Sequence, residues 1–192
     1  MKQLIQSLNN GEIYISDLPA PSIKKGHLLV SSNVTLISSG TERMLLEFGK
    51  ANWINKAKKQ PEKVKQVIEK VKTDGFQTTF NSVKNKIDQP IALGYNNVGT
   101  IIGIGEGVEG FKLGQRVVSN GEHAEIVVVP KHLCAIIPEE VDNNTAAFTI
   151  LSSIGLQGIR LANPTIGETV FVIGLGLIGM LTAQLLLAQG CK

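Results

Sequence analysis

The hydrophobic pattern near the end of the chain predicts a strand, a glycine turn and a helix in immediate succession. Residues 169–173 form an unbroken apolar run rich in β-branched side chains, as expected of a strand buried on both faces. Residues 180–189 are apolar on nearly every side, which indicates a buried helix, and Gly190 is its expected stop. The glycines between these two elements have the spacing Gly-x-Gly-x-x-Gly over residues 174–179.

This context gives each glycine of the motif a physical role. Gly174 permits the tight turn, Gly176 lets a pyrophosphate approach the backbone, and Gly179 allows the helix and the strand to pack closely. The helix N-terminus offers N–H groups and a positive dipole end to the phosphates. The sequence therefore predicts a dinucleotide site, the alternative being a plain buried βα unit. The predicted cofactor-binding residues are Gly174, Leu175, Gly176, Leu177, Ile178 and Gly179.

A second copy of the glycine spacing, over residues 105–110, lacks that context. It follows the apolar run 98–104, but Gly114 interrupts the next residues before a helix can form. Two of its positions are Glu106 and Glu109, which would repel a pyrophosphate. This copy is therefore interpreted as turns between strands.

Short strands are expected over much of the remaining chain, where apolar stretches lie between proline and glycine breaks such as Gly40. The first two flank Asn9-Asn10-Gly11, which predicts a β-hairpin. Many short strands, then a helix and a βα unit, indicate a β-rich barrel that leads into a doubly wound domain. The expected strands cover residues 2–7, 12–18, 27–38, 97–104, 116–119, 123–129 and 133–137.

Helix-capping residues mark two further helices. Thr41 is expected to cap a short helix that reaches Phe48. Asp142 or Asn143 is expected to cap a longer helix that runs to about Ala162.

Residues 50–88 differ in charge from the rest of the chain. They hold ten lysines and four acidic residues, a net +6, so the remainder of this +3 chain carries −3. Apolar residues recur at helical spacing, which predicts two amphipathic helices joined near Asp74-Gly75, with their apolar rows facing the protein. Two interpretations stay open: a helical hairpin with solvated lysines, or a basic lid over an anionic substrate. The rows are Val64, Val67, Ile68 and Val71, then Phe76, Phe80, Val83 and Ile87.

The bulk composition argues against several classes of protein. A net charge of only +3 gives no reason to expect a nucleic-acid partner. No apolar run reaches the ~18 residues of a membrane span, and the first residues lack a signal-peptide pattern, so we expect no membrane partner and a cytoplasmic location. Cys134 and Cys191 suit neither a disulfide framework nor a zinc spacing.

The order of these elements and motifs resembles the medium-chain dehydrogenase/reductase family. The resemblance covers most of the chain apart from residues 50–88. It rests on five stretches that follow the family's order. They are Ser38-Ser39-Gly40-Thr41-Glu42, Gly94 to Thr100, Gly103 to Val117, Ala124 to Pro130 and Gly167 to Gly179.

The resemblance implies a mixed fold with a β-barrel and an α/β part. A chaperonin-10-like β-barrel with a helical hairpin insertion would be followed by the first βα unit of a Rossmann domain. The implied domains are residues 1–142, a catalytic barrel with the insertion at 50–88, and 143–192, a connecting helix and an incomplete dinucleotide-binding domain. The ribose-binding acid is expected ~20 residues after the glycine motif begins, beyond Lys192. The choice between NAD and NADP therefore stays open, and we expect an N-terminal fragment of a larger dehydrogenase.

The chain departs from the zinc-dependent members of this family at each implied ligand. Ser39 stands where the first cysteine ligand is expected, Tyr95 where the histidine is, and Asn96 where its glutamate neighbour is. The third ligand is expected near residues 149–151, which hold no cysteine, and only residues 120–122 stand in place of the structural zinc lobe. A hydroxyl, a phenol and an amide do not make a usual zinc site. The expected protein is therefore a zinc-less member with no bound metal.

This zinc-less pattern with a helical insertion resembles a subgroup of bi-domain bacterial oxidoreductases. In these proteins the barrel and Rossmann half is fused to a second half of the glucose–fructose oxidoreductase/inositol dehydrogenase type. The subgroup is associated with sugar or cell-envelope polysaccharide metabolism. The resemblance thus implies hydride transfer between NAD or NADP and a carbonyl or hydroxyl carbon, for example of a sugar or nucleotide sugar.

Without zinc, another group must stabilise charge on the substrate oxygen. Tyr95 is the candidate general acid or hydrogen-bond donor, and Ser39 and Thr41 extend a candidate proton relay. The alternative is that these side chains only satisfy backbone groups in an emptied site. A second hypothesis for the whole chain is a non-catalytic binding or scaffold module of a larger enzyme, which would not need the glycine motif.

The apolar elements near the end of the chain predict self-association. A strand at 169–173 without neighbours would leave both of its edges open to another chain. A helix with four exposed leucines would forfeit ~1.5–3 kcal/mol for each of them. We therefore expect a dimer or larger homo-oligomer with residues 169–190 at the contact, beside a small-molecule substrate as the other partner.

Overall fold

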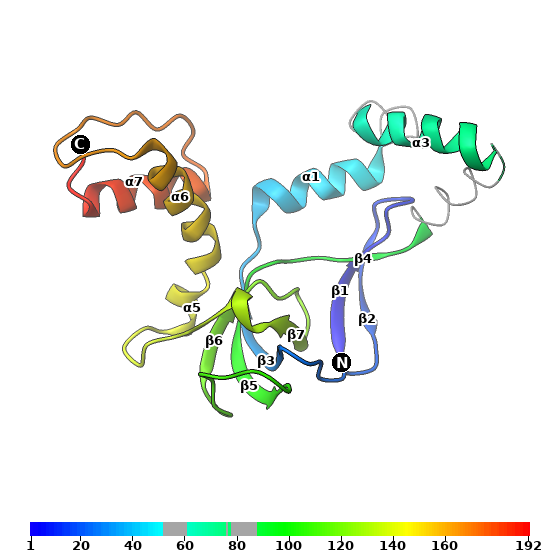
Figure 1. Cartoon of the computed structure of the whole chain (residues 1–192), viewed down its shortest axis with the longest axis horizontal. Helices are drawn as coiled ribbons and strands as arrows, with labels where there is room; N and C mark the ends of the chain where they lie inside the picture. Colours follow the sequence, from blue (N-terminus) through cyan, green and yellow to red (C-terminus); the bar gives the residue numbers. More distant parts are fainter. Residues whose placement is uncertain (52–60, 76, 78–87) are drawn as a thin grey trace. The chain divides into compact units, whose positions relative to one another are not determined.

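The structure is a computed structural model of the 192-residue chain, and it describes all residues except 52–60, 76 and 78–87. The chain divides into two compact units (Figure 1). Unit 1 holds Met1, Pro19–Ser38 and Gly94–Lys192. Unit 2 holds Lys2–Leu18 and Ser39–Leu93. Each unit is described by itself below.

Unit 2 is built on a three-stranded antiparallel sheet with the order β2-β1-β4. Strands β1 (Lys2–Gln6) and β2 (Ile13–Asp17) form the predicted hairpin, with Lys2 opposite Asp17 and Gln6 opposite Ile13. The short strand β4 (Ile91–Ala92) pairs with the other edge of β1. The alternating sequence and the Asn9-Asn10-Gly11 turn thus predicted this hairpin correctly.

The hairpin turn lies against the end of helix α1 (Ser39–Lys50). Gly11 has a φ of +74°, which favours glycine, and a Cβ on it would lie 2.5 Å from Cγ of Lys50. The fully buried Gln6 fixes the same contact, because its Nε2 donates a 3.0 Å hydrogen bond to the carbonyl of Leu45. Glycine at position 11 therefore serves both the turn and the close approach of the helix.

Helix α1 begins earlier and runs further than predicted. It starts at Ser39, so Gly40 and Thr41 lie inside its first turn and Thr41 is not its cap. It continues past Phe48 to Lys50. The strand does end before Gly40, as predicted, but the prediction of Thr41 as the cap was wrong. The helix can include Gly40, because one glycine in a helix costs only about 1 kcal/mol.

The first of the two predicted lysine-rich helices is present as α3 (Pro61–Asp74). Val64 and Val67 of its apolar row are half-buried, whereas Glu62 and Lys65 are exposed, as the predicted pattern requires. The second predicted row, on Phe76, Phe80, Val83 and Ile87, lies outside the described residues.

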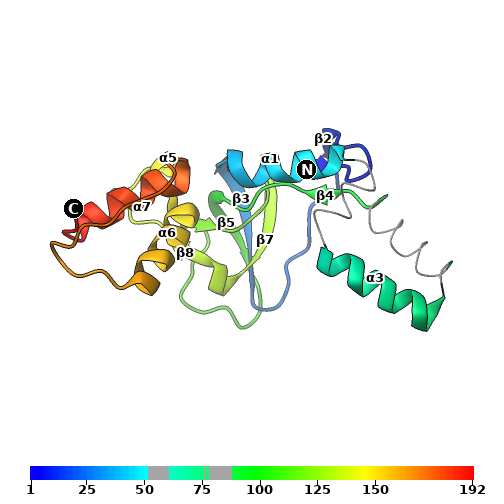
Figure 2. The ribbon, with the colours of Figure 1, turned by 90° about the horizontal axis from the view of Figure 1, so that it is seen from above.

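Unit 1 contains a five-stranded antiparallel sheet with the order β7-β3-β5-β6-β8, of which Figure 2 labels β3, β5, β7 and β8. The predicted ranges for β5 and β6 match the structure at both ends, and the other three strands are shorter than predicted. The strands are β3 (His27–Thr35), β5 (Asn97–Ile104), β6 (Arg116–Ser119), β7 (Ile126–Pro130) and β8 (Cys134–Ile136).

The two faces of this sheet carry two separate apolar clusters, because side chains alternate along each strand. One cluster includes Leu28, Val30, Ile101, Val117, Val127 and Val129. The other includes Val98, Val118, Ile137, Ala146 and Ala147, so the second cluster lies between the sheet and helix α5 (Asn143–Ala146).

Two helices replace the single helix predicted over residues 143–162. Asp142 caps α5 as predicted, and helix α6 (Thr149–Ala162) ends at the predicted residue. Between the two helices the chain makes a tighter turn, in which the N–H of Phe148 donates to the carbonyl of Thr145 three residues back. The capping residue was visible in the sequence, but this one-turn break was not.

Helix α7 (Leu177–Ala188) packs beside α6, as Figures 1 and 2 both show. Gly155 of α6 makes this approach possible, because a Cβ on it would lie 2.5 Å from Oγ1 of Thr182 in α7. Gly190 has a φ of +92° and follows the helix, as predicted.

The prediction of a strand at residues 169–173 is not met, since the structure assigns no strand there. The N–H of Lys192 donates to the carbonyl of Glu168 at 2.8 Å, and the N–H of Val170 donates to the carbonyl of Lys192 at 2.9 Å. This pattern is the one made by neighbouring parallel strands. Val170 and Val172 pack toward the helices, on Ile159, Leu186 and Cys191. Among the residues that the structure describes, the last residue of the chain is the one that makes this pattern with the segment, which is too little for a ladder.

Candidate functional site

The glycine motif at residues 174–179 forms a turn onto the N-terminus of α7. Gly174 has a φ of +94°, a conformation that favours glycine. A Cβ on Gly179 would collide with the carbonyl oxygen of Gly174, so the first and last glycines of the motif are in direct contact. Gly176 precedes the helix and has open space around the position that its Cβ would take. The first and third glycines thus shape the turn, and the second leaves room beside it.

The first turn of α7 has the properties of an anion site. No side chain caps the helix at Gly176, and the first turn holds no acidic residue. The helix begins at Leu177, three residues before the predicted start, so the N–H groups of Leu177, Ile178 and Gly179 precede the first intrahelical hydrogen bond. Leu175 is 71% exposed beside them. These residues fit the pyrophosphate of a dinucleotide, because the open space at Gly176 lies next to the positive end of the helix.

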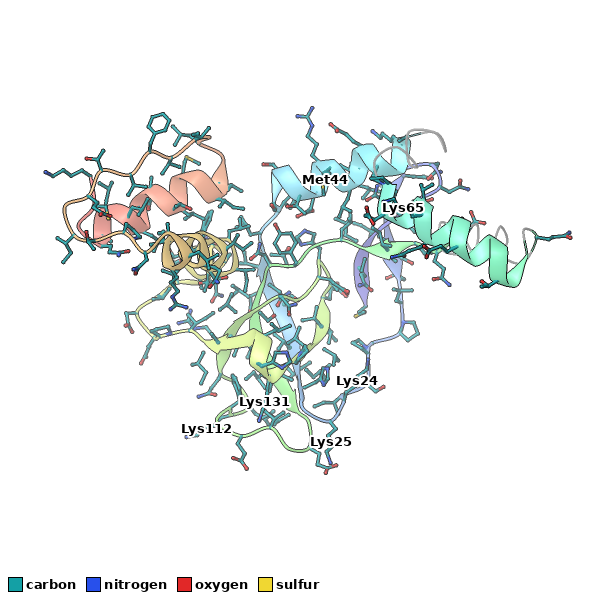
Figure 3. The ribbon with its side chains drawn as sticks, turned by 45° about the horizontal axis from the view of Figure 1, so that its top comes forward. Lys24, Lys25, Met44, Lys65, Lys112 and Lys131 are labelled. Carbon is teal, nitrogen blue, oxygen red and sulfur yellow. The ribbon has the colours of Figure 1, made fainter. Side chains whose placement is uncertain are left out.

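The second glycine motif shows what the spacing alone produces. Residues 105–110 form turns between β5 and β6, as predicted. Glu106 pairs with Lys25 at 2.7 Å, and Nζ of Lys131 donates to the carbonyl of Gly107 at 3.3 Å. Figure 3 shows these lysines around the turns. Their partners are acidic or main-chain groups, so this end of the sheet does not resemble a phosphate site.

The three predicted catalytic residues belong to different units. Ser39 and Thr41 lie exposed in the first turn of α1, in unit 2. Tyr95 is half-buried just before β5, in unit 1. Each residue is described within its own unit, so the grouping of the three in one site stays a prediction.

A group of buried polar side chains beside Tyr95 was not predicted from the sequence. Asn96, Asn97 and Ser119 are all fully buried, and His123 is 8% exposed. Nδ2 of Asn97 donates to Oγ of Ser32 at 2.7 Å, across the β3–β5 pair. The available signal was the polar run Tyr-Asn-Asn at the start of a strand that is otherwise apolar.

The residues at the expected metal position do not fit zinc. Within the described parts of the chain, no three His, Cys, Asp or Glu side chains gather in a way that could hold a metal ion. The expected third-ligand stretch is the first turn of α6, where Leu151 is fully buried. Burial raises the pKa of the Cys134 thiol to about 11, which disfavours the thiolate that a metal requires. The absence of zinc from the protein itself stays a prediction.

Among the described residues, no helix is long and apolar enough to cross a membrane.

Comparison with known proteins agrees with this arrangement. Residues 65–139 match the alcohol dehydrogenase GroES-like domain. The chain is 27% identical to (R,R)-butanediol dehydrogenase of Bacillus subtilis (strain 168) over 128 residues, which is 53% of this chain and 37% of that protein. These matches support a medium-chain dehydrogenase/reductase. The match thus covers little more than a third of the length of this relative.

Solved structures of similar fold extend the comparison to the whole chain. An alcohol dehydrogenase superfamily protein from Novosphingobium aromaticivorans aligns with a TM-score of 0.72 at 18% identity, covering 100% of this chain and 52% of that one. A quinone oxidoreductase from Thermus thermophilus, solved also in complex with NADPH, aligns with a TM-score of 0.65 at 20% identity, covering 100% and 51%. At these identities the likeness shows the fold alone, and the chain spans about half of each structure.

Proposed function

We propose that this chain is the N-terminal part of a zinc-independent, NAD(P)-dependent oxidoreductase located in the cytoplasm. The observation that carries the proposal is the turn at Gly174–Gly179, which leaves open space at Gly176 directly before the uncapped N-terminus of α7. NAD or NADP, when bound, would supply the hydride-transfer chemistry. The NADPH complex of the T. thermophilus quinone oxidoreductase supports a dinucleotide as the ligand.

In this proposal the residues of the glycine turn position the cofactor, and the glycines leave the space beside its phosphates free of side chains. The N–H groups of Leu177, Ile178 and Gly179 donate to the pyrophosphate, and Gly176 keeps the approach clear. The half-buried Val170 and Val172 hold the segment before the turn against the apolar cluster of Ile159, Leu186 and Cys191. The remaining strands of the dinucleotide-binding domain would lie in the longer protein.

The proposed substrate carries a carbonyl or hydroxyl carbon, as in a sugar or nucleotide sugar. (R,R)-butanediol dehydrogenase acts by its name on a hydroxyl-bearing substrate, which supports this class. The phenol of Tyr95 would donate to the reacting oxygen, and Ser39 and Thr41 would continue a proton relay. A longer protein with Tyr95→Phe should then lose most of its turnover while it still binds the cofactor. Unchanged kcat would remove Tyr95 from this role and favour the alternative, in which these side chains satisfy backbone groups.

We further propose that the longer protein carries a second half of the glucose–fructose oxidoreductase/inositol dehydrogenase type. The pattern of the sequence that resembles such fused enzymes supports this proposal. In the longer protein, the region around α3 would act either as a solvated helical insertion or as a basic lid over an anionic substrate.

The proposed dinucleotide site can be tested with substitutions at one position. Asp at position 176 should stabilise α7, because an acidic N-cap suits the helix dipole, but it should repel a pyrophosphate. Gly176→Ser supplies a neutral cap as the matched control. We expect Gly176→Asp to raise the unfolding temperature and to abolish NADH and NADPH binding measured by calorimetry. Gly176→Ser should retain more binding than Gly176→Asp does.

The second candidate function is a non-catalytic binding or scaffold module. One observation favours it. Zinc-dependent enzymes of the resembled family are expected to have a set of metal ligands, and the described residues of this chain contain no such set. A scaffold would bind neither NADH nor NADPH, in this chain or in the longer protein. Calorimetric titration of both forms therefore separates the two functions.

A further inference from the structure

Asn96 carries a fully buried side chain whose amide has no hydrogen-bond partner. It precedes β5 and is 0% exposed. Within the described part of the chain, neither its Oδ1 nor its Nδ2 meets a donor or acceptor. Only its main chain is paired, since its carbonyl accepts a 3.3 Å hydrogen bond from the N–H of Leu36. An amide in this state is rare, because burial removes the water that would otherwise satisfy it.

The next residue provides an internal comparison. Asn97 is equally buried, but its Nδ2 donates to Oγ of Ser32 at 2.7 Å and lies 3.5 Å from the carbonyl of Glu122. The same residue type at the same depth therefore finds a partner for its amide nitrogen one position along the chain, although its Oδ1 has none among the described residues. The lack of a partner at Nδ2 of Asn96 is thus a property of its own position.

Alternation along the strand places the Asn96 side chain on the face of Val98. That face carries the apolar cluster of Val98, Val118, Ala146 and Ala147 under α5. A leucine, which is close to asparagine in shape, would suit an apolar surrounding better than an amide does. The stability of the fold therefore does not account for an amide here, and local exceptions of this kind concentrate at functional sites.

The backbone that presents Asn96 is held in place. Gly94 has a φ of +94°, and a Cβ on it would lie 2.6 Å from Cγ of His123. No other residue type fits at position 94 without moving the imidazole ring. The segment that leads from Gly94 to Asn96 is thus held against His123.

We propose that the Asn96 carboxamide is a binding site for a hydroxyl group. Such a group donates its O–H to Oδ1 and accepts from Nδ2, so it satisfies both idle atoms. The hydroxyl belongs either to the substrate or to a bound water that the substrate displaces. This inference rests on the proposed function, because it makes Asn96 a residue that positions the proposed hydroxyl-bearing substrate.

The test is nuclear magnetic resonance of the ¹⁵N-labelled 192-residue chain, with no cofactor present. The side-chain NH₂ signals of Asn96 are assigned by their loss in Asn96→Leu, or in Asn96→Ser if the leucine variant does not fold. Cross-peaks from this NH₂ group to added 1,2-propanediol would assign the hydroxyl to the substrate. Cross-peaks to water alone, with or without the diol, would assign it to a water. Cross-peaks to neither would overturn the proposal.

Urea unfolding of two matched variants gives an independent readout. Asn97→Leu should lower the unfolding midpoint, because it leaves Ser32 without its partner. Asn96→Leu should leave the midpoint equal or higher if the hydroxyl comes from the substrate, and should lower it if a water is held in the free chain. A lower unfolding midpoint of Asn96→Leu, without a cross-peak from the NH₂ group to water, would show that the amide stabilises the protein without binding a hydroxyl. That result would overturn the proposal. A cofactor that fails to bind would refute the proposed function and leave both of these measurements valid.

Discussion

Arg116 of β6 donates a 3.0 Å hydrogen bond from its guanidinium to Oδ1 of Asn143, the first residue of α5. The same group donates to the carbonyl of Val141 at 2.9 Å, of Pro138 at 3.0 Å and of Glu139 at 3.2 Å. One side chain therefore holds the whole connection between the last strand and the helices that lead to the glycine turn. The planar fork of arginine allows four such bonds, which a lysine ammonium cannot reproduce.

Arg116→Lys should therefore destabilise unit 1 by about 1–3 kcal/mol, since several carbonyls of the connection lose their donor. Urea unfolding of the variant checks this. Arg160→Lys, at an exposed position of α6, is the control and should change stability by less than ~0.5 kcal/mol. Equal stability of the two variants would show that the connection holds without Arg116.

Two glycines of α6 should respond in opposite directions to the same change. A Cβ at Gly155 would lie 2.5 Å from Oγ1 of Thr182, whereas a Cβ at Gly158 meets nothing within 4 Å. Gly158→Ala should stabilise the protein by about 0.5–1 kcal/mol through helix propensity alone. Gly155→Ala should destabilise it, because overpacking costs about 1–3 kcal/mol and exceeds that gain. Thermal unfolding of both variants measures the sign, and a stabilised Gly155→Ala would contradict the packing of α6 on α7.

The cap of α5 should make stability depend on pH. The hydroxyl of Thr145, its N–H and the N–H of Asn144 all donate to Asp142, and they hold the pKa of this carboxyl below its ordinary value. A lowered folded-state pKa contributes stability that is present above the unfolded-state value of 3.8 and is lost as the pH falls through the folded-state pKa.

Asp142→Ala should thus lower the unfolding temperature at pH 7 and change it little in strong acid, where the wild-type carboxyl is also protonated. Unfolding temperatures of both proteins from pH 7 down to pH 2 measure this. A difference between them that stays constant over the whole range would mean that the charge of Asp142 contributes nothing to the cap.

The sequence predicted elements well where local chemistry decides them. The strands Asn97–Ile104 and Arg116–Ser119 match their predicted ranges, because each is an apolar run with glycines close to both of its ends. The predicted cap at Asp142 is confirmed, because its side chain accepts hydrogen bonds from N–H groups only two and three residues along the chain. Gly174 and Gly176 also stand at a turn before a helix, and Gly179 lies in the first turn of that helix, as their spacing indicated.

The failures concern features that depend on neighbours in space. The sequence of residues 169–173 is typical of a strand, but a ladder needs a partner strand. Within the described ranges, only Lys192 shares hydrogen bonds of the parallel pattern with this segment. The break between α5 and α6 comes from a turn at Phe148 that no glycine or proline marks. Asn96 and Asn97 are identical in type, so their different pairing could not be predicted without the fold.

The exposed apolar face of residues 169–175 leads to the last prediction, that this 192-residue chain self-associates. Val170 and Val172 pack on the helices, whereas Phe171 is 87% exposed and Ile173 is 89% exposed on the opposite face. Contiguous apolar exposure of this kind is unusual on a monomer. We therefore expect a second copy to cover this face.

Phe171→Ser should weaken this association, because burying one large apolar side chain is worth about 1.5–3 kcal/mol, or roughly 10- to 150-fold in the dissociation constant. Ile15→Ser is the matched control, since Ile15 is 67% exposed in β2 of the other unit and should leave the association unchanged. Sedimentation equilibrium at micromolar concentrations measures both variants against the wild type. A clean wild-type monomer in which residues 169–190 are still protected from hydrogen exchange would show that the segment is stable uncovered, and the contact would then have no role in this chain.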